Sequence, residues 1–183
     1  LSNFFLRTKL LPPRVAPNIL DRPRLIDRLR ANLSLPITLI AADAGSGKTT
    51  LISEFVRSQS SRPAVWYQLD HTDADPSVFI GYLVRGIRDH FPCFGEQVLL
   101  YLSENSDEIA RFPERPADLL INEILTSIEQ PFLLVLDDYH HIGRATAVHR
   151  IVDRLVTYSS ELTHIVITTR DFPPLAVMRR RTQ

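Results

Sequence analysis

The chain has 183 residues, in which 21 lysines and arginines balance 21 aspartates and glutamates. This length suits one α/β domain with a substantial core and is short for two. The near-zero net charge argues against a dedicated polyanion-binding surface. The one cysteine, Cys93, excludes an internal disulfide and a CxxC metal site. No apolar run reaches membrane-spanning length and no signal-peptide pattern is evident, so we expect a cytoplasmic protein without membrane contact.

The first 20 residues are interrupted by several prolines, and we expect them to form an extended arm. A domain over residues 21–183 is expected to follow. It begins with a short predicted helix, for which Asp21 is the expected N-cap. The apolar face of this helix comprises Leu25, Ile26 and Leu29.

A glycine-containing loop between a predicted strand and a predicted helix is the most informative feature of the sequence. The apolar run over residues 37–41 indicates a buried parallel strand, and apolar residues recur at helical spacing over residues 51–56. Between them lies a variant of the phosphate-binding pattern GxxxxGK[ST], in which alanine replaces the first glycine. The segment reads Ala42, Asp43, Ala44, Gly45, Ser46, Gly47, Lys48, Thr49 and Thr50.

The residue types in this loop suit a nucleoside triphosphate. Gly45 and Gly47 let the backbone curl so that successive N–H groups point at phosphate oxygens. Lys48 would place an ammonium against the outer phosphates, and the Thr49 hydroxyl would ligate Mg²⁺. The positive end of the following helix adds to the attraction. The alternative is a glycine-rich turn before an ordinary helix.

Further strands and helices alternate along the rest of the chain. Residues 64–69 predict a strand, and Asp75 with Pro76 predicts the start of a helix. Residues 91–118 contain three prolines and give no clear pattern beyond helical spacing at 98–102. Later helices are predicted near 119–128 and 147–155, and strands near 132–136 and 165–167. This alternation implies a doubly wound parallel sheet, in which ligands bind beyond the carboxyl ends of the strands.

Charged side chains follow two of these strands. Asp137 comes directly after a buried strand, which is the Walker B position where a carboxylate holds Mg²⁺. Asp138 is placed to orient or deprotonate an attacking water. Arg170 ends the last strand, where its forked guanidinium would sense a γ-phosphate. The alternatives are two solvated carboxylates and a surface arginine paired with Asp171.

Two other clusters resemble metal sites only superficially. His140 and His141 are adjacent and lack a spaced third ligand, which favours a structural or hydrogen-bonding role. Asp70, Asp73 and Asp75 lack the glycine and glutamate of a calcium loop. We interpret these three aspartates as turn and cap residues.

Collinear runs over nearly the whole chain resemble the nucleotide-binding domain of MalT-type regulators. These are ATP-dependent LuxR-family activators of the STAND class of signal-transduction ATPases. The most specific runs are Leu-Asp-Asp-Tyr-His at 136–140 and Thr-Thr-Arg at 168–170; the P-loop alone is less specific. The other matching runs are residues 9–14, 22–26, 65–70 and 171–175.

The resemblance implies a fold, a function and a set of site residues. The fold would be a three-layer P-loop NTPase of ASCE/STAND type, with a mostly parallel sheet that is truncated before its last core strand. Such proteins rest with ADP; their ATP form self-associates and activates transcription, and slow hydrolysis resets the switch. By similarity Asp138 and Arg170 serve hydrolysis, Thr49 and Asp137 hold Mg²⁺, and Arg22 and Arg24 border the adenine. Nucleotide contacts would come from Ala42, Ala44, Gly45, Ser46, Gly47, Lys48, Thr49 and Thr50.

Asp43 and Ser46 depart from the family pattern, which usually has proline and a bulky residue at these positions. Asp43 places a negative charge beside the expected phosphate site. The family's helical, winged-helix, sensor and DNA-binding domains lie outside these residues, so no DNA binding is expected from this segment.

Two alternative functions are a P-loop ATPase that works as an enzyme or motor and a nucleotide-binding module that never hydrolyses. The rate of turnover separates them, and we expect only weak ATPase activity. We also expect the P-loop strand to lie beside the Arg170 strand, with its other edge exposed.

Overall fold

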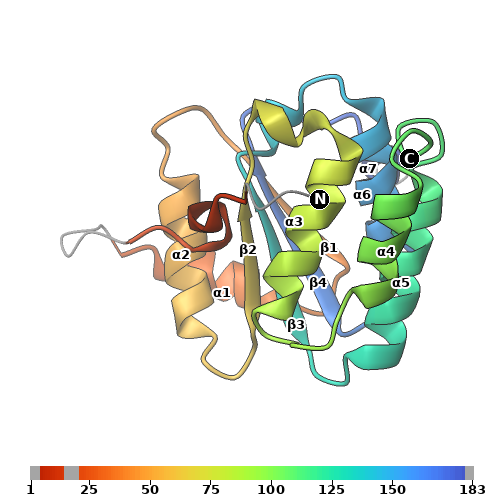
Figure 1. Cartoon of the computed structure of the whole chain (residues 1–183). Coiled ribbons are helices and arrows are strands. Elements are labelled where there is room, and N and C mark those ends of the chain that lie inside the picture. The colour runs from red at the N-terminus through yellow and green to blue at the C-terminus, as the bar shows by residue number, and fades with distance from the viewer. Residues whose placement is uncertain (1–4, 15–20, 180–183) are drawn as a thin grey trace.

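A four-stranded parallel sheet lies between two layers of helices (Figure 1). The computed structural model describes residues 5–14 and 21–179. Its strands are β1 (Ile37–Ala41), β2 (Ala64–Gln68), β3 (Phe132–Asp137) and β4 (Thr163–Thr169), in the order β1-β4-β3-β2. The doubly wound parallel sheet is therefore confirmed. As predicted, β1 pairs with β4, the strand that leads into Arg170, and it lies at the edge of the sheet.

The register of the strands brings the sequence motifs to one end of the sheet. Ala41 at the end of β1 lies opposite Thr169 of β4, and Asp137 at the end of β3 lies opposite Gln68 of β2. Leu136 lies opposite Ile167, which places Asp137 beside Thr168. The loops that follow β1, β3 and β4 therefore meet at the carboxyl ends of the strands.

The helices on the two faces of the sheet explain the composition of the strands. α1 (Pro23–Ala31) and α2 (Lys48–Ser58) cover one face, where Ile52 and Phe55 pack against Trp66. The other face is covered by α3 (Pro76–Arg88), α4 (Glu96–Glu104), α5 (Glu114–Ser127) and α6 (Thr146–Tyr158), and the short α7 (Ala176–Arg179) follows β4. Every residue of β3 and β4 is buried, as expected of strands covered on both faces.

The start of α3 confirms its predicted cap, whereas the start of α1 does not. The Asp75 carboxylate accepts hydrogen bonds from the N–H groups of Ser77 (2.7 Å) and Val78 (3.2 Å). In α1 the N-cap is Arg22, without a side-chain cap, so the prediction that Asp21 caps this helix is wrong. Pro23 at the first helical position fixes the start of the helix one residue beyond the reach of Asp21.

Three 3-10 turns were not predicted: η1 (Arg7–Leu10), η2 (His71–Ala74) and η3 (Tyr139–Ile142). In η2 the Asp70 carboxylate accepts from Thr72 N (2.8 Å), and Asp73 accepts from Asp70 N (2.7 Å). These bonds confirm that Asp70 and Asp73 are turn and cap residues.

Leu25 is 42% exposed, so the expected apolar face of α1 is formed by Ile26 and Leu29 only. No described helix is long and apolar enough to cross a membrane.

Candidate functional site

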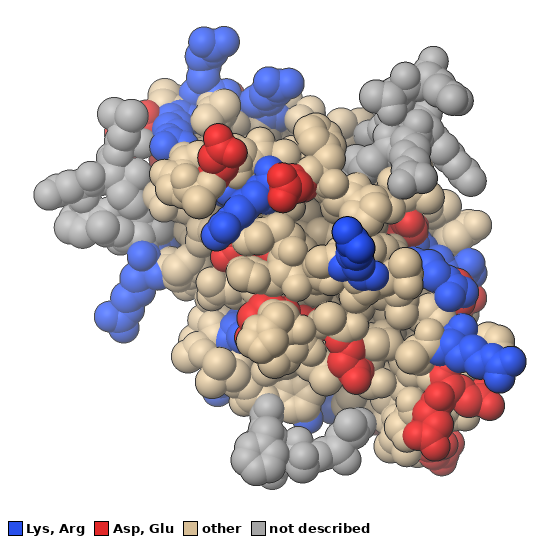
Figure 2. All heavy atoms as spheres, turned by 90° about the horizontal axis from the view of Figure 1, so that it is seen from above, with Lys and Arg blue, Asp and Glu red and all other residues tan. Residues whose placement is uncertain are grey.

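A cavity of about 320 Å³ lies at the carboxyl end of the sheet, where the loop between β1 and α2 meets the ends of β3 and β4. It is lined by Ala44, Gly45, Gly47, Lys48, Thr49, Thr50, Asp138 and Arg170. The structure therefore brings the glycine loop together with two side chains from distant parts of the sequence. Figure 2 looks onto the molecule from this end, and basic and acidic side chains are interspersed over the described part of that face.

The loop has the backbone conformation that its glycines permit. Gly45 (φ 76°) and Gly47 (φ 81°) both adopt the left-handed region, which is unfavourable for residues with a Cβ. Gly47 is the N-cap of α2 and provides no side-chain cap, so the first N–H groups of that helix remain available to an anion.

Lys48, the first residue of α2, is buried and folded back on the loop. Its Nζ donates to the carbonyl oxygens of Ala42 (2.5 Å) and Asp43 (3.0 Å). The contact with Asp43 uses the backbone carbonyl, and this residue is itself exposed. To reach a phosphate, the ammonium group must exchange these carbonyl oxygens for phosphate oxygens.

Two arginines predicted to border the adenine occupy different environments. Arg22 lies against the loop, where its Nη1 donates to the carbonyl of Ser46 (3.0 Å). Its Nη2 would lie 3.0 Å from a Cβ added at Gly47. Arg24 is exposed and does not line the cavity. The adenine contacts of both arginines stay predictions.

Asp137 is completely buried at the end of β3. Its Oδ1 accepts hydrogen bonds from the hydroxyl groups of Thr49 (3.0 Å) and Thr168 (2.5 Å). Its Oδ2 is buried without a hydrogen-bond partner among the described residues. Burial raises the pKa of the Asp137 carboxyl; the nearby charge of Asp138 also raises it, and the two hydroxyl donors act in the opposite direction. An unpartnered carboxylate oxygen close to a threonine hydroxyl fits the oxygen ligands that Mg²⁺ prefers.

Asp138 and Arg170 face the cavity from the ends of β3 and β4. Asp138 has φ 57°, which makes it the one non-glycine residue with positive φ in the described part of the chain. Its N–H donates to the hydroxyl oxygen of Thr168 (3.0 Å). Arg170 is exposed and lines the cavity, and among the described residues it forms no ion pair with Asp171.

The histidine pair does not build a metal site. No group of three or more His, Cys, Asp or Glu side chains within residues 5–14 and 21–179 could hold a metal ion. The two rings lie 4.3 Å apart, and burial, followed by the charges of His141 and Arg170, lowers the pKa of His140. Both ring nitrogens of His140 lack a hydrogen-bond partner in the described structure, so of the two expected roles, structural or hydrogen-bonding, the second is not seen for His140. His149 has that role instead, between the Tyr139 hydroxyl (2.8 Å) and the Gly143 carbonyl (2.9 Å).

Thr168 is the residue that the sequence-based prediction of the site missed. Its hydroxyl contacts both Asp137 and Asp138, although it lies 31 positions beyond Asp137 in the sequence. A hydroxyl residue two positions before Arg170, at the end of a strand predicted to be parallel, was the available signal. This signal identifies a site residue only when it is known which strand lies beside β3.

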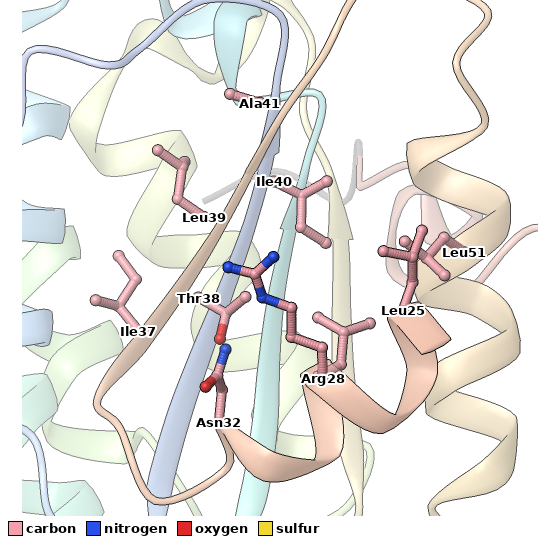
Figure 3. Close-up of a pocket in the computed structure, with 10 residues that line it drawn as sticks. Leu25, Arg28, Asn32, Ile37, Thr38, Leu39, Ile40, Ala41 and Leu51 are labelled. Carbon is pink, nitrogen blue, oxygen red and sulfur yellow. The ribbon is translucent and has the colours of Figure 1, made fainter. Parts of the chain in front are cut away.

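A larger cavity of about 460 Å³, which shares no lining residue with this site, lies along the open edge of β1 (Figure 3). It is bounded by α1, by β1 and by Leu51 of α2, and the side chains of Arg28 and Asn32 extend over it. The cavity is there because β1 has a neighbouring strand on one side only.

The strand order and the glycine loop between β1 and α2 define a P-loop NTPase fold, as predicted. No protein-family model matches the chain. Curated relatives named HTH-type transcriptional regulator MalT match 96% of it: 31% identity over 180 residues in Yersinia enterocolitica, 29% over 178 in Serratia proteamaculans and 28% over 179 in Vibrio parahaemolyticus. The chain is thus a MalT-type segment, and the resemblance is confirmed. It spans 19% of the length of these relatives.

A solved structure with a related arrangement is that of Drosophila ORC bound to DNA. It matches with a TM-score of 0.49 and 13% sequence identity, covering 82% of this chain and 80% of that chain. Similarity at this level says nothing about function.

Proposed function

We propose that this chain is the ATP/ADP-binding switch domain of a transcription regulator, with slow Mg²⁺-dependent hydrolysis that resets the switch. The observation that carries the proposal is the convergence of the glycine loop, Asp138 and Arg170 on one cavity, beside the buried Asp137. Regulation of transcription is inferred from the name of the MalT relatives.

Nucleotide binding would use the loop backbone and the start of α2. The curled loop and the uncapped first turn of α2 present N–H groups to the phosphates. Lys48 would leave the carbonyls of Ala42 and Asp43 and place its ammonium on the β- and γ-phosphates. Ala44, Gly45, Ser46 and Thr50 complete the proposed cradle. Because the loop already has this conformation, the binding step needs only local movement.

Mg²⁺ would be held by the Thr49 hydroxyl and by Asp137, the latter through bound water. The unpartnered Oδ2 of Asp137 and the lone pairs of the Thr49 hydroxyl oxygen are the groups left for it. When bound, the metal neutralises charge on the β- and γ-phosphates.

Hydrolysis would require a water in line with the bond between the γ-phosphorus and its bridging oxygen. Asp138, at the edge of the cavity, would orient this water and accept its proton as the new P–O bond forms and the old one breaks. Arg170 would donate to the γ-phosphate oxygens from the end of β4. Loss of the γ-phosphate removes this contact, which gives Arg170 a means to distinguish ATP from ADP.

The whole protein's behaviour forms part of the same proposal. We expect the ADP form to be the resting state and the ATP form to self-associate. Within residues 5–14 and 21–179 the structure offers no broad basic face for DNA in the view of Figure 2, and the proposal assigns DNA binding to other parts of the regulator.

The test measures binding and turnover separately. Isothermal titration of the 183-residue chain with ATP and Mg²⁺ should give saturable binding, which Lys48→Ala abolishes. Asp138→Asn should keep that binding and remove hydrolysis, because holding phosphates and activating water are separate tasks. Unchanged ATP affinity in Lys48→Ala would overturn the proposed site.

Turnover by the whole protein separates the proposal from its two alternatives. Slow hydrolysis with retention of ADP supports a switch. Steady turnover stimulated by a partner or polymer supports an ATPase motor, and binding without any hydrolysis supports an interaction module.

A further inference from the structure

The hydroxyl group of Thr168 connects the two acidic residues at the end of β3. It donates to Oδ1 of Asp137 (2.5 Å) and accepts the N–H of Asp138 (3.0 Å). Thr168 and Asp137 are both completely buried, so water does not compete for these bonds. One side chain therefore contacts the carboxylate of the first aspartate and the backbone of the second.

The geometry of the sheet explains why this contact is possible. β3 and β4 are parallel neighbours, and the register places Thr168 beside Asp137. The side chain of Thr168 does not line the cavity, whereas Asp138 does. Thr168 thus acts on the site from behind, through the residues at the end of β3.

We infer that Thr168 is a positioning residue of this site: it orients Asp137 toward the metal and holds Asp138 in the conformation that faces the cavity. This inference rests on the proposed function, since it concerns the same Mg²⁺ and the same water. It assigns a role to a side chain that would touch neither the nucleotide nor the metal.

The hydrogen-bonding capacity of the groups supports the orientation of Asp137. Among the described residues the two hydroxyl donors to Asp137, Thr49 and Thr168, both bond to Oδ1, so Oδ2 is the oxygen left for the metal or its water. Thr49 lies in the first turn of α2 and is itself a proposed Mg²⁺ ligand, whereas Thr168 belongs to the central sheet. Without the Thr168 hydroxyl, the carboxylate would depend on Thr49 alone for its orientation.

The second contact supports the conformation of Asp138. A non-glycine residue at φ 57° is held there only when its surroundings favour it. The bond from its N–H to Thr168 is a specific restraint at this residue. Removal of the acceptor would leave that N–H without a partner and allow the Asp138 side chain to leave the cavity.

The experiment compares three variants of the 183-residue chain. Thr168→Val keeps the shape of the side chain and removes its hydroxyl, and Thr168→Ser keeps the hydroxyl. The matched control is Thr169→Val, because the Thr169 hydroxyl, on the same strand, donates to the carbonyl of Asp171 (2.8 Å) and not to the site. ATP binding is measured by isothermal titration with Mg²⁺ and with a chelator, so that the gain in affinity from Mg²⁺ is isolated.

We expect Thr168→Val to reduce the gain in affinity from Mg²⁺ by about tenfold or more, as is typical for residues that orient metal ligands, with metal-free ATP binding unchanged. Thr168→Ser and Thr169→Val should behave as the wild type. A wild-type gain in Thr168→Val overturns the inference and leaves the proposed function standing. Absence of ATP binding by the wild type overturns the proposed function itself.

A measurement on the wild type covers the case in which Thr168→Val fails to fold. The amide proton of Asp138 should exchange slowly with solvent, both without nucleotide and with Mg²⁺·ATP, since Thr168 accepts it in either state. Fast exchange of this amide in the folded protein overturns the inference.

Discussion

The ammonium of Lys9 lies 2.8 Å and 2.7 Å from the two carboxylate oxygens of Asp73, and both side chains are buried. Lys9 also lies 2.9 Å from Asp70. The contact joins η1 of the N-terminal arm to η2, the turn that follows β2. Residues 5–14 are thus attached to the edge of the sheet opposite β1.

Lys9→Met should destabilise the chain by about 3 kcal/mol, because it leaves the Asp73 carboxylate buried without its counter-charge. Methionine keeps the apolar stem of the side chain, so the loss reports mainly on charge. Chemical denaturation measures the free energy of unfolding. The double variant Lys9→Met/Asp73→Asn should recover part of the loss, since the amide oxygen can still accept from Asp70 N.

An exposed ion pair provides the control for this prediction. Arg30 and Asp27 lie 3.0 Å apart with side chains 51% and 71% exposed, so Arg30→Met should change stability by less than about 0.5 kcal/mol. Equal effects of the two substitutions would show that the buried pair contributes no more than a surface one.

The strands could be predicted from their apolar runs, and β3 and β4 are buried along their whole length. β1 was predicted as a buried strand, but it lies at the edge of the sheet and is half-buried after Ile37. Residues 132–136 were predicted as a strand, and the structure extends it by one residue, to Asp137. The glycine loop was also predictable, because left-handed backbone and a lysine at the helix start leave a recognisable local pattern. These are features in which neighbouring residues contain the whole signal.

Features that depend on partners distant in sequence could not be predicted in this way. Lys9 and Asp73 are 64 positions apart, and neither residue shows locally that it is buried. Thr168 resembled any polar residue at a strand end until β4 was known to lie beside β3. The prediction that Asp21 caps α1 failed for a local reason, because Pro23 at the first helical position places the start of the helix beyond Asp21.

Gly47→Ala should destabilise the nucleotide-free chain by about 1–2 kcal/mol through its left-handed backbone (φ 81°) and by about 1 kcal/mol more through Arg22. The added Cβ would lie 3.0 Å from Nη2 of Arg22 and displace the guanidinium that donates to Ser46. The free energy of unfolding without nucleotide is the measurement.

Gly45→Ala is the matched control within the same loop. Its φ of 76° imposes the same backbone cost, but nothing lies within 4 Å of an added Cβ. The expected loss is therefore smaller than for Gly47→Ala by the contribution of Arg22. If Arg22→Ala in the background of Gly47→Ala costs as much as it does in the wild type, the proposed displacement is wrong.

Asp137→Asn should change how stability depends on pH. Burial, together with the nearby Asp138, raises the pKa of the Asp137 carboxyl above its ordinary value of 3.8, so the folded state binds this proton more tightly than the unfolded state. The contribution of this bound proton to stability is therefore fully present below pH 3.8, and it is lost as the pH rises through the folded-state pKa. Asparagine does not ionise, so the variant should gain stability relative to the wild type from acidic to neutral pH.

The measurement is the melting temperature of both proteins between pH 3.5 and 7.5, without Mg²⁺ or nucleotide. The wild type should lose stability relative to Asp137→Asn as the pH rises, and addition of Mg²⁺ with ATP should reverse the difference, since the metal compensates the buried charge that asparagine lacks. The neighbouring Asp138→Asn, at a partly exposed site, is the control for the loss of one charge. If the melting temperatures of wild type and Asp137→Asn change with pH in parallel, this carboxyl titrates alike in the folded and unfolded states. Its burial would then have no electrostatic consequence.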